Sequence, residues 1–290
     1  MQSRQAVLIT AYKNPEQIEN IIDFLGDEFE YYIHADKKSR ADFSAFQNIS
    51  RDNIHFYQKY KVNWGSNDHL KCIIMLAREA LADGRNQFFH LITGQDFPAK
   101  PAEHFLRELD ISKDYLEHFP LPSDKWRDGG LDRIQYFTPY EMVNGRSRFG
   151  VRLMSALIKT QKRLGIRRKT LQKTFTRIYG GSTYWSLTRN SLQYVLDTLD
   201  KNPKIMRSMK YTFCSEEIVF QTVLMNSHFA QNIVNDNLRY IDWESGRGGY
   251  PAFLDGSDFD GIKNSNKIFA RKFHEWDAEG LREMMTQKSP

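Results

Sequence analysis

The sequence AVLITA at residues 6–11, followed by NPE at 14–16, decides the fold. The first segment is short, apolar and rich in β-branched side chains, which is typical of a strand buried on both faces. Asn14 can cap a helix, and proline is favoured in the first turn because its missing N–H would have no partner there. A buried strand that leads directly into a helix is typical of an α/β protein.

Apolar segments downstream continue this alternation. They predict strands at 30–35, 54–57 and 88–93 and a helix at 68–81. Strands that alternate with helices form a mainly parallel, Rossmann-like sheet covered by helices. Ligands of such sheets bind at the carboxyl ends of the strands.

The second half of the chain has a more mixed pattern. We expect strands at 115–120, 134–138, 183–187 and 238–243, and helices at 151–164, 190–199, 216–225 and 276–285. The chain has no internal repeat, low-complexity segment or linker rich in proline and serine. One continuous α/β domain over 1–290 is therefore expected, with a nucleotide-binding half at 1–110 and an acceptor-binding and catalytic half at 111–290.

Composition limits the class of protein. With 20 Phe and 14 Tyr in 290 residues, the chain can form a sizeable core. No apolar run is long enough to span a bilayer, and the first ten residues become polar too soon for a signal peptide. Cys72 and Cys214 each lie in an apolar helical context, so reduced core thiols are favoured over a disulfide. Cysteine and histidine are not spaced for a zinc site.

The net charge of +5 is concentrated in one segment. Residues 146–177 contain eleven Lys or Arg and neither Asp nor Glu. A solvated helical face is one interpretation. Attraction to an anionic membrane surface, or to phosphate on a lipid-linked acceptor, is weighed equally with it. A nucleic-acid partner is disfavoured because no nucleic-acid-binding motif accompanies the charge.

A pair of carboxylates, Glu216 and Glu217, lies in an apolar helical pattern, and the cations Arg247 and Lys272 follow later in the chain. A carboxylate at an apolar helix start can serve as a general base, although acidic side chains also favour helix starts because of the helix dipole. Fixed cations can stabilise a departing diphosphate. Together these residues suggest a sugar transfer from a nucleotide donor without a metal.

Seven segments, in order, resemble the core-2/I-branching β-1,6-N-acetylglucosaminyltransferase family, which also contains the peptide O-xylosyltransferases. The two most diagnostic contain GQDFP and FARKF. The seven segments are YIHADKK at 32–38, VNWG at 62–65, LITGQDFP at 91–98, GSTYWSLTR at 181–189, SEE at 215–217, LRYIDW at 238–243 and FARKF at 269–273.

The resemblance implies a GT-A type fold and an inverting, metal-independent transfer from UDP-GlcNAc or UDP-xylose to a glycan or lipid-linked glycan. No cofactor is expected besides the UDP-sugar co-substrate. Because relatives in eukaryotes carry a membrane anchor and many disulfides, a bacterial member at the cytoplasmic side of the membrane is expected. It would act in the synthesis of a surface polysaccharide.

The resemblance also assigns residues. Glu217 is implied as the base, ahead of Glu216, which is grouped with the acceptor site. The donor site is implied to contain Asp36, Arg247 and Lys272, and Asp96 is implied to have a structural or donor-site role. The acceptor site is implied to contain Glu117, Lys125, Arg127 and Trp243. Trp185 is expected in the core, because it lies in an alternating strand pattern.

Two questions stay open in the sequence. Asp258-Phe259-Asp260 is a literal Asp-x-Asp, but it comes too late in the chain for the usual metal site, and a polar surface loop is favoured. Arg271 competes with Lys272 for the diphosphate, because alternate side chains of a strand point to opposite faces. A different donor sugar, a non-catalytic glycan- or nucleotide-binding module and a membrane-surface adaptor remain alternatives.

Overall fold

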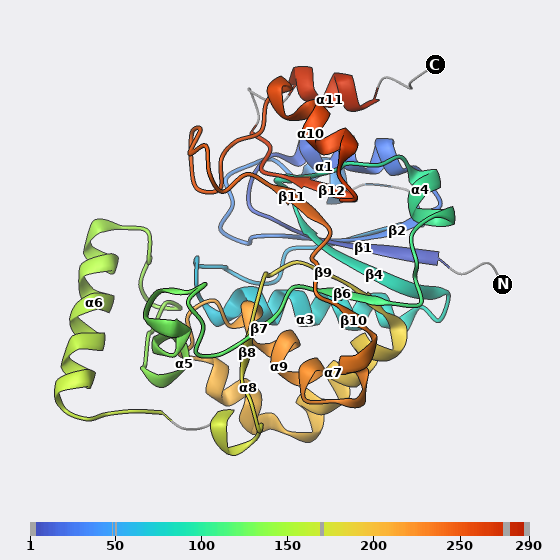
Figure 1. The fold of residues 1–290 in the computed structure, drawn as a ribbon. Coiled ribbons are helices and arrows are strands. Elements are labelled where there is room, and N and C mark those ends of the chain that lie inside the picture. The colour runs from blue at the N-terminus through green and yellow to red at the C-terminus, as the bar shows by residue number, and fades with distance from the viewer. Residues whose placement is uncertain (1–3, 48, 50, 169–170, 275–278, 287–290) are drawn as a thin grey trace.

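A computed structural model describes residues 4–47, 49, 51–168, 171–274 and 279–286. Its centre is a seven-stranded sheet with the strand order β10-β6-β9-β4-β1-β2-β3 (Figure 1). Helices cover both faces of this sheet, which is the layered arrangement predicted from the alternating sequence pattern.

The predicted parallel strands form one half of the sheet. Strand β1 (Arg4–Ala11) lies between β2 (Phe29–Ala35) and β4 (Asn86–Thr93) and is parallel to both, and β3 (Ile54–Tyr57) extends the sheet beyond β2. The connections are the helices α1 (Pro15–Leu25), α2 (Ser44–Gln47) and α3 (Asn67–Ala82). Asn14 stands at the start of α1 as predicted, but its side chain makes no capping hydrogen bond.

Strand β1 is buried on both faces, as its sequence predicts. Ala6 and Leu8 belong to the core on the side of α3, whereas Val7 and Ile9 belong to the core on the side of α1. Successive side chains of a strand point to opposite faces, so one apolar run supplies both cores.

The other half of the sheet is mixed. Strand β9 (Trp185–Thr188) is antiparallel to both β4 and β6 (Asp114–Leu116), and β10 (Ile233–Val234) is parallel to β6. Trp185 is fully buried, as expected. A mainly parallel sheet with an antiparallel strand inserted is consistent with the GT-A fold.

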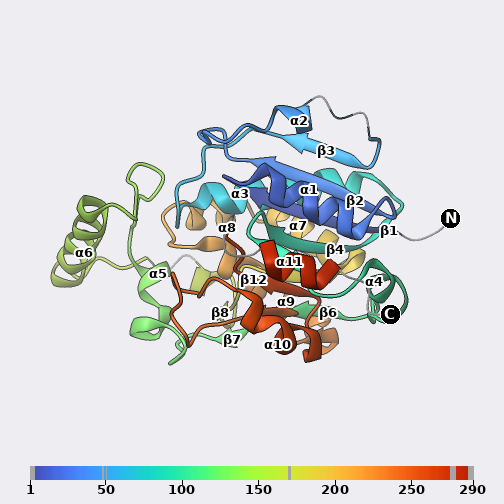
Figure 2. The same cartoon turned by 90° about the horizontal axis from the view of Figure 1, so that it is seen from above.

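Two helical layers enclose the sheet (Figures 1 and 2). The layer below it in Figure 1 contains α3, α7 (Arg189–Lys201), α8 (Pro203–Met209) and α9 (Val219–Met225). The layer above it contains α1, α10 (Phe259–Asn264) and α11 (Glu279–Thr286). Two further helices are α4 (Ala102–Arg107) and α6 (Arg148–Arg163), and the latter stands at one margin of the molecule.

Two small sheets complete the fold. In the first, β12 (Phe269–Arg271) lies between β11 (Arg239–Ile241) and β5 (Asp96–Pro98). The second pairs β7 (Phe119–Pro120) with β8 (Tyr179–Gly180). No helix in the described ranges has the length and apolar character needed to cross a bilayer.

Several short elements differ from the sequence predictions. Residues 134–138 were expected as a strand, but α5 (Asp132–Gln135) forms a helical turn there. The strand expected at 115–120 is divided between β6 and β7. The helix expected at 216–225 begins only at Val219, after the 3₁₀ turn Ser215–Glu217. Part of the expected terminal helix, residues 276–278, lies outside the described residues. Short segments carry too few periods for their pattern to distinguish helix from strand.

The Asp-x-Asp segment is also more ordered in its local structure than a surface loop. Asp258 ends the 3₁₀ turn Gly256–Asp258, and Phe259 begins α10. The carboxylate of Asp258 is buried and accepts a hydrogen bond from the backbone N–H of Asp255 at 2.9 Å, completing a capping box. This part of the segment therefore has a structural task.

Candidate active site

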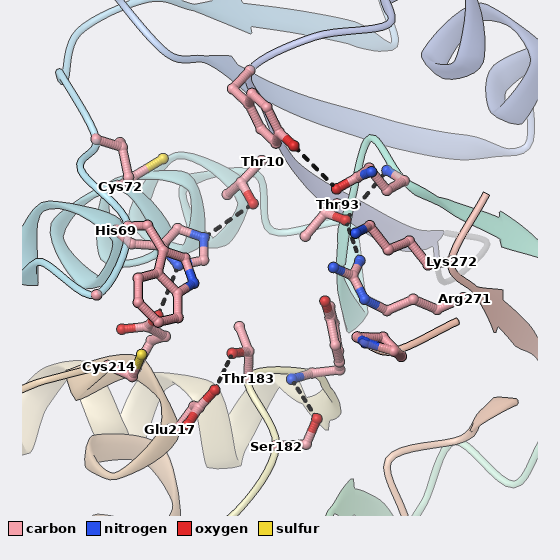
Figure 3. A pocket seen from close by; sticks show the side chains of 18 of the residues that line it. Thr10, His69, Cys72, Thr93, Ser182, Thr183, Cys214, Glu217, Arg271 and Lys272 are labelled. Atoms are coloured by element: carbon pink, nitrogen blue, oxygen red, sulfur yellow. Dashed lines mark hydrogen bonds and ion pairs between the residues drawn. The ribbon is translucent and has the colours of Figure 1, made fainter. Parts of the chain in front are cut away.

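A cavity of about 920 Å³ opens at the carboxyl ends of β1, β2 and β4. Its lining there includes Thr10, His34, Asp36 and Thr93. The parallel order of the strands predicts a ligand site at this edge, and the volume is in the range of small-molecule sites. Figure 3 shows this pocket from close by.

Two cations enter the cavity together. Arg271 and Lys272 both line it, on the side opposite Glu217 (Figure 3). The expectation that only one of them could face the donor is therefore wrong. Strand β12 ends at Arg271, so the alternation of a regular strand does not extend to Lys272.

The guanidinium of Arg271 is held in place by a buried carboxylate. Its Nη1 lies 2.9 Å from Oδ1 of Asp96 and donates to Oγ1 of Thr93 at 2.7 Å. Asp96 is fully buried and also accepts a hydrogen bond from the backbone N–H of Thr93 at 2.5 Å. Asp96 lies behind the cavity lining, so its contact with the site runs through Arg271.

The ammonium of Lys272 lies in an unfavourable environment for its charge. Partial burial lowers the pKa of Lys272 to about 8, and the neighbouring Arg271 adds to this effect. An anion bound between the two side chains would relieve their repulsion. The pair is therefore suited to a phosphate or diphosphate group.

Arg247 lies outside the cavity lining, although the resemblance placed it at the donor site. Its guanidinium makes ion pairs with three carboxylates: it lies 3.2 Å from Asp242, 2.7 Å from Asp255 and 2.7 Å from Asp258. These contacts fix the loop between β11 and α10, and Arg271 occupies the place beside Lys272 instead.

Glu217 reaches the cavity from the 3₁₀ turn that precedes α9. One carboxylate oxygen lies 2.5 Å from Nη1 of Arg133, and the other accepts a long hydrogen bond of 3.5 Å from Thr183. Burial raises the pKa of Glu217; Arg133 opposes this shift and Glu216 adds to it. A carboxylate with a raised pKa at a cavity wall can accept a proton.

Arg133 was not identified in the sequence. Its guanidinium stacks 3.6 Å from the ring centroid of Trp126 and lies 5.1 Å from that of Phe213. The aromatic faces hold the cation beside Glu217. No local motif distinguishes Arg133, because Glu217 and Phe213 come from a distant part of the chain and only Trp126 is close in sequence.

Glu216 has a different environment from Glu217. It is buried, and its Oε1 lies 3.0 Å from Nδ1 of His69, whose Nε2 lies 3.2 Å from Oγ1 of Thr10. Figure 3 shows His69 between the strand edge and the Glu217 wall. The side-chain contacts from Glu216 through His69 to Thr10 connect the wall that contains Glu217 with the strand edge. Glu216 is therefore placed to orient the His69 ring.

Four of the five residues expected at the acceptor site line the cavity, Glu216 among them. Glu117, Lys125 and Trp243 are among its lining, and Asn237 donates a hydrogen bond to Glu117 at 2.9 Å. The Trp243 ring lies 5.0 Å from that of Tyr250, forming an exposed aromatic edge. Arg127 differs: its side chain is 96% exposed and lies outside the lining.

Asp36 lines the cavity at the end of β2, where the resemblance implied contact with the nucleotide. Its Oδ1 accepts hydrogen bonds from the backbone N–H groups of Lys38 at 3.0 Å and Val62 at 3.2 Å. The carboxylate therefore also fixes two loops at the cavity rim. Tyr184 was assigned no role in the sequence, yet it lines the cavity beside Arg271.

Within the described ranges, His, Cys, Asp and Glu do not form a group of three that could hold a metal ion. Cys72 and Cys214 are buried free thiols, as expected, and both contribute to the cavity wall. Burial raises the pKa of each thiol well above its usual value, so neither is activated as a nucleophile.

The mixed sheet, with its cavity at the strand ends and its paired cations, defines a GT-A type protein. Residues 6–263 match the family model described as Core-2/I-Branching enzyme, which covers most of the chain. The protein belongs to the core-2/I-branching family of glycosyltransferases, whose donors are nucleotide sugars.

Curated relatives include animal and plant enzymes. Xylosyltransferase 2 of Rattus norvegicus is 26% identical over 226 residues, covering 75% of this chain and 24% of the relative. Xylosyltransferase 1 of Mus musculus is 25% identical over 229 residues, covering 73% and 21%. Beta-glucuronosyltransferase GlcAT14B of Arabidopsis thaliana is 31% identical over 110 residues, covering 37% and 25%. The chain thus spans about a quarter of the length of these relatives.

Proposed function

We propose that this protein is an inverting glycosyltransferase that moves a sugar from a UDP-sugar to a hydroxyl of a glycan acceptor. One observation carries the proposal: Arg271 and Lys272 enter the cavity opposite Glu217. Two cations suit a diphosphate, and a carboxylate with a raised pKa suits a base.

In the proposed reaction, Glu217 accepts the proton of the acceptor hydroxyl as its oxygen attacks the anomeric carbon. The new glycosidic bond forms on the face opposite the breaking bond to UDP, so the anomeric configuration inverts. Negative charge grows on the departing diphosphate, where Arg271 and Lys272 can stabilise it. Donor and base on opposite walls fit this in-line geometry.

Two fixed cations perform the electrostatic task that a divalent metal performs in other GT-A enzymes. We therefore propose that turnover needs no metal ion. Asp258 supports this proposal, because its carboxylate is engaged by Arg247 and by the backbone of Asp255. Asp258 is not among the residues that line the cavity.

GlcNAc is the first donor sugar to test, and xylose is the main alternative. The former follows from the motifs in the sequence, and the latter from the names of the xylosyltransferase relatives. Glucuronate follows in the same way from the plant relative. The acceptor is proposed to be a glycan or lipid-linked glycan of a bacterial surface polysaccharide, handled at the cytoplasmic side of the membrane.

On the acceptor side, Glu117, Lys125 and Trp243 support the proposal. A carboxylate and an ammonium can bind sugar hydroxyls, and an exposed indole can stack on a sugar ring. Arg133 joins this group in place of Arg127, because it contacts the proposed base directly.

A screen of UDP-sugars for slow hydrolysis, with and without EDTA, tests the proposal. We expect release of UDP from one sugar nucleotide at a rate that EDTA leaves unchanged. Tight UDP binding without turnover of any sugar would favour a non-catalytic nucleotide-binding module. A steep loss of rate in EDTA would contradict the metal-independent part.

A further inference from the structure

Helix α6 (Arg148–Arg163) stands at the margin of the molecule, away from the central sheet (Figures 1 and 2). Only one face of it is buried, through Gly150, Met154 and Gln161. The opposite face is exposed and has no part in the proposed active site. The exposed face of α6 is therefore available for a role separate from catalysis.

Four exposed cations form a stripe on this face. At about 100° per residue, the positions of Arg148, Arg152, Lys159 and Arg163 fall within about 60° of one another around the helix axis. A stripe of one sign over the length of a helix attracts an extended anionic surface more than a single small anion.

Two other cations of the basic segment have local structural partners. Arg168 donates to the backbone oxygens of Tyr136 at 3.0 Å and Tyr211 at 2.7 Å, so it fixes neighbouring loops. Lys162 lies 2.7 Å from a carboxylate oxygen of Asp132. The four cations of the stripe are exposed, as are Arg146, Arg167, Lys173 and Arg177 elsewhere in the segment.

Large apolar side chains flank the stripe at both ends of the helix. Phe149 is 71% exposed and Val151 is 55% exposed near the start, and Leu164 is 67% exposed just after the end. An ordinary solvated face does not need exposed aromatic and aliphatic groups beside its charges. A helix with a basic face and exposed apolar residues is typical of the membrane interface.

We propose that α6 docks the protein on the surface of an anionic lipid bilayer. The arginines and lysine would contact the headgroups, and Phe149 and Leu164 would enter the boundary with the acyl chains. A nucleic acid would match the charge and could stack a base on Phe149, but it would leave the aliphatic side chain of Leu164 without a role. The exposed aliphatic group therefore favours lipid.

Docking through α6 would bring the bilayer close to one edge of the cavity. Asn144 and Arg146, which line the cavity, come directly before the first turn of this helix. An acceptor held in the membrane would thus be presented near the site. The docking itself does not depend on the proposed transfer reaction and can be measured without turnover.

Vesicle co-sedimentation of the full chain tests the proposal. The vesicles contain phosphatidylcholine alone or mixed with phosphatidylglycerol. We expect binding only to the mixed vesicles, weakening with salt. The triple variant Arg152→Glu/Lys159→Glu/Arg163→Glu should lose about tenfold or more of this affinity. Phe149→Ser, which keeps every charge, should also weaken binding.

A second triple variant serves as the matched control. The residues Lys201, Lys204 and Arg207 are exposed in and around α8, and replacing all three with Glu changes the net charge by the same amount. This control should retain most of the vesicle binding. Circular dichroism should show that both triple variants are folded.

Three results would overturn the proposal. The first is no binding of the unmodified protein to the mixed vesicles. The second is a loss of vesicle binding in the α8 control as large as that of the α6 triple variant, which would show a general effect of net charge. The third is release from the vesicles by a single-stranded RNA oligonucleotide at equal phosphate concentration, which would identify nucleic acid as the preferred partner.

Discussion

Gly181 approaches Glu117 so closely that a β-carbon at position 181 would lie 1.9 Å from the Glu117 carbonyl oxygen. The N–H of Gly181 also donates to the carbonyl oxygen of Glu217 at 3.0 Å. One glycine thus brings the backbone of the proposed acceptor residue and that of the proposed base together.

Gly181→Ala should therefore damage the site. The added methyl group must push the backbone of Glu117 away, and overpacking of this kind costs about 1–3 kcal/mol of stability. We expect a lower melting temperature and a larger loss of kcat/KM than the stability change alone explains. Gly84→Ala is the matched control, because a β-carbon there meets nothing within 4 Å. If Gly181→Ala and Gly84→Ala had the same melting temperature and the same kcat/KM, the steric argument would be contradicted.

Asp96→Asn tests whether the buried carboxylate positions Arg271. Removing one partner of a buried ion pair typically costs about 3–5 kcal/mol, because the other charge stays buried and uncompensated. We expect reduced stability and weaker UDP binding, measured by chemical unfolding and by calorimetry. If UDP binds more tightly to Asp96→Asn, removing a negative charge near the diphosphate matters more than holding Arg271 in place. The role proposed for Asp96 would then be wrong.

Arg247→Ala separates the donor site from the neighbouring loop. Its ion pairs with Asp242, Asp255 and Asp258 are partly exposed, so we expect a modest loss of stability of roughly 1 kcal/mol. UDP affinity should stay unchanged, whereas Lys272→Ala should weaken it clearly. If Arg247→Ala binds UDP weakly, Arg247 belongs to the donor site after all.

The sequence predicts much of the fold and of the candidate site. Where its predictions fail, the failure has a physical reason. The run at 6–11 supplies both cores because its apolar character matches a strand buried on two faces. Arg247 was assigned to the donor site from the resemblance, and the sequence cannot show that three carboxylates gather around it. Lys272 was assigned to the diphosphate and Arg271 was kept only as its competitor, because strand alternation was applied beyond the end of β12 at Arg271.

The pH dependence of UDP binding should depend on Lys272. Its pKa is lowered to about 8 in the free protein, so it is charged below that pH and becomes neutral above it. Affinity for UDP should therefore be full near pH 7 and fall at pH 9, by up to about tenfold per pH unit. Titration calorimetry at these pH values checks the effect.

Lys272→Arg is the control for that experiment, because a guanidinium stays charged throughout this range. Its UDP affinity should show only the titration of the ligand and of other groups. If the UDP affinity of Lys272→Arg fell with pH as much as that of the unmodified protein, the pH dependence would not come from Lys272.

Glu217→Gln should abolish transfer while UDP affinity stays nearly intact, because the amide cannot accept the proton and lies opposite the phosphate cations. Glu216→Gln is the informative comparison. The amide can still contact His69, so we expect a partial loss of rate. Transfer is measured with the donor sugar identified in the UDP-sugar screen. If Glu217→Gln keeps most of the activity while Glu216→Gln loses it, the base is Glu216, and the wall formed by Glu216 and His69 is the reactive one.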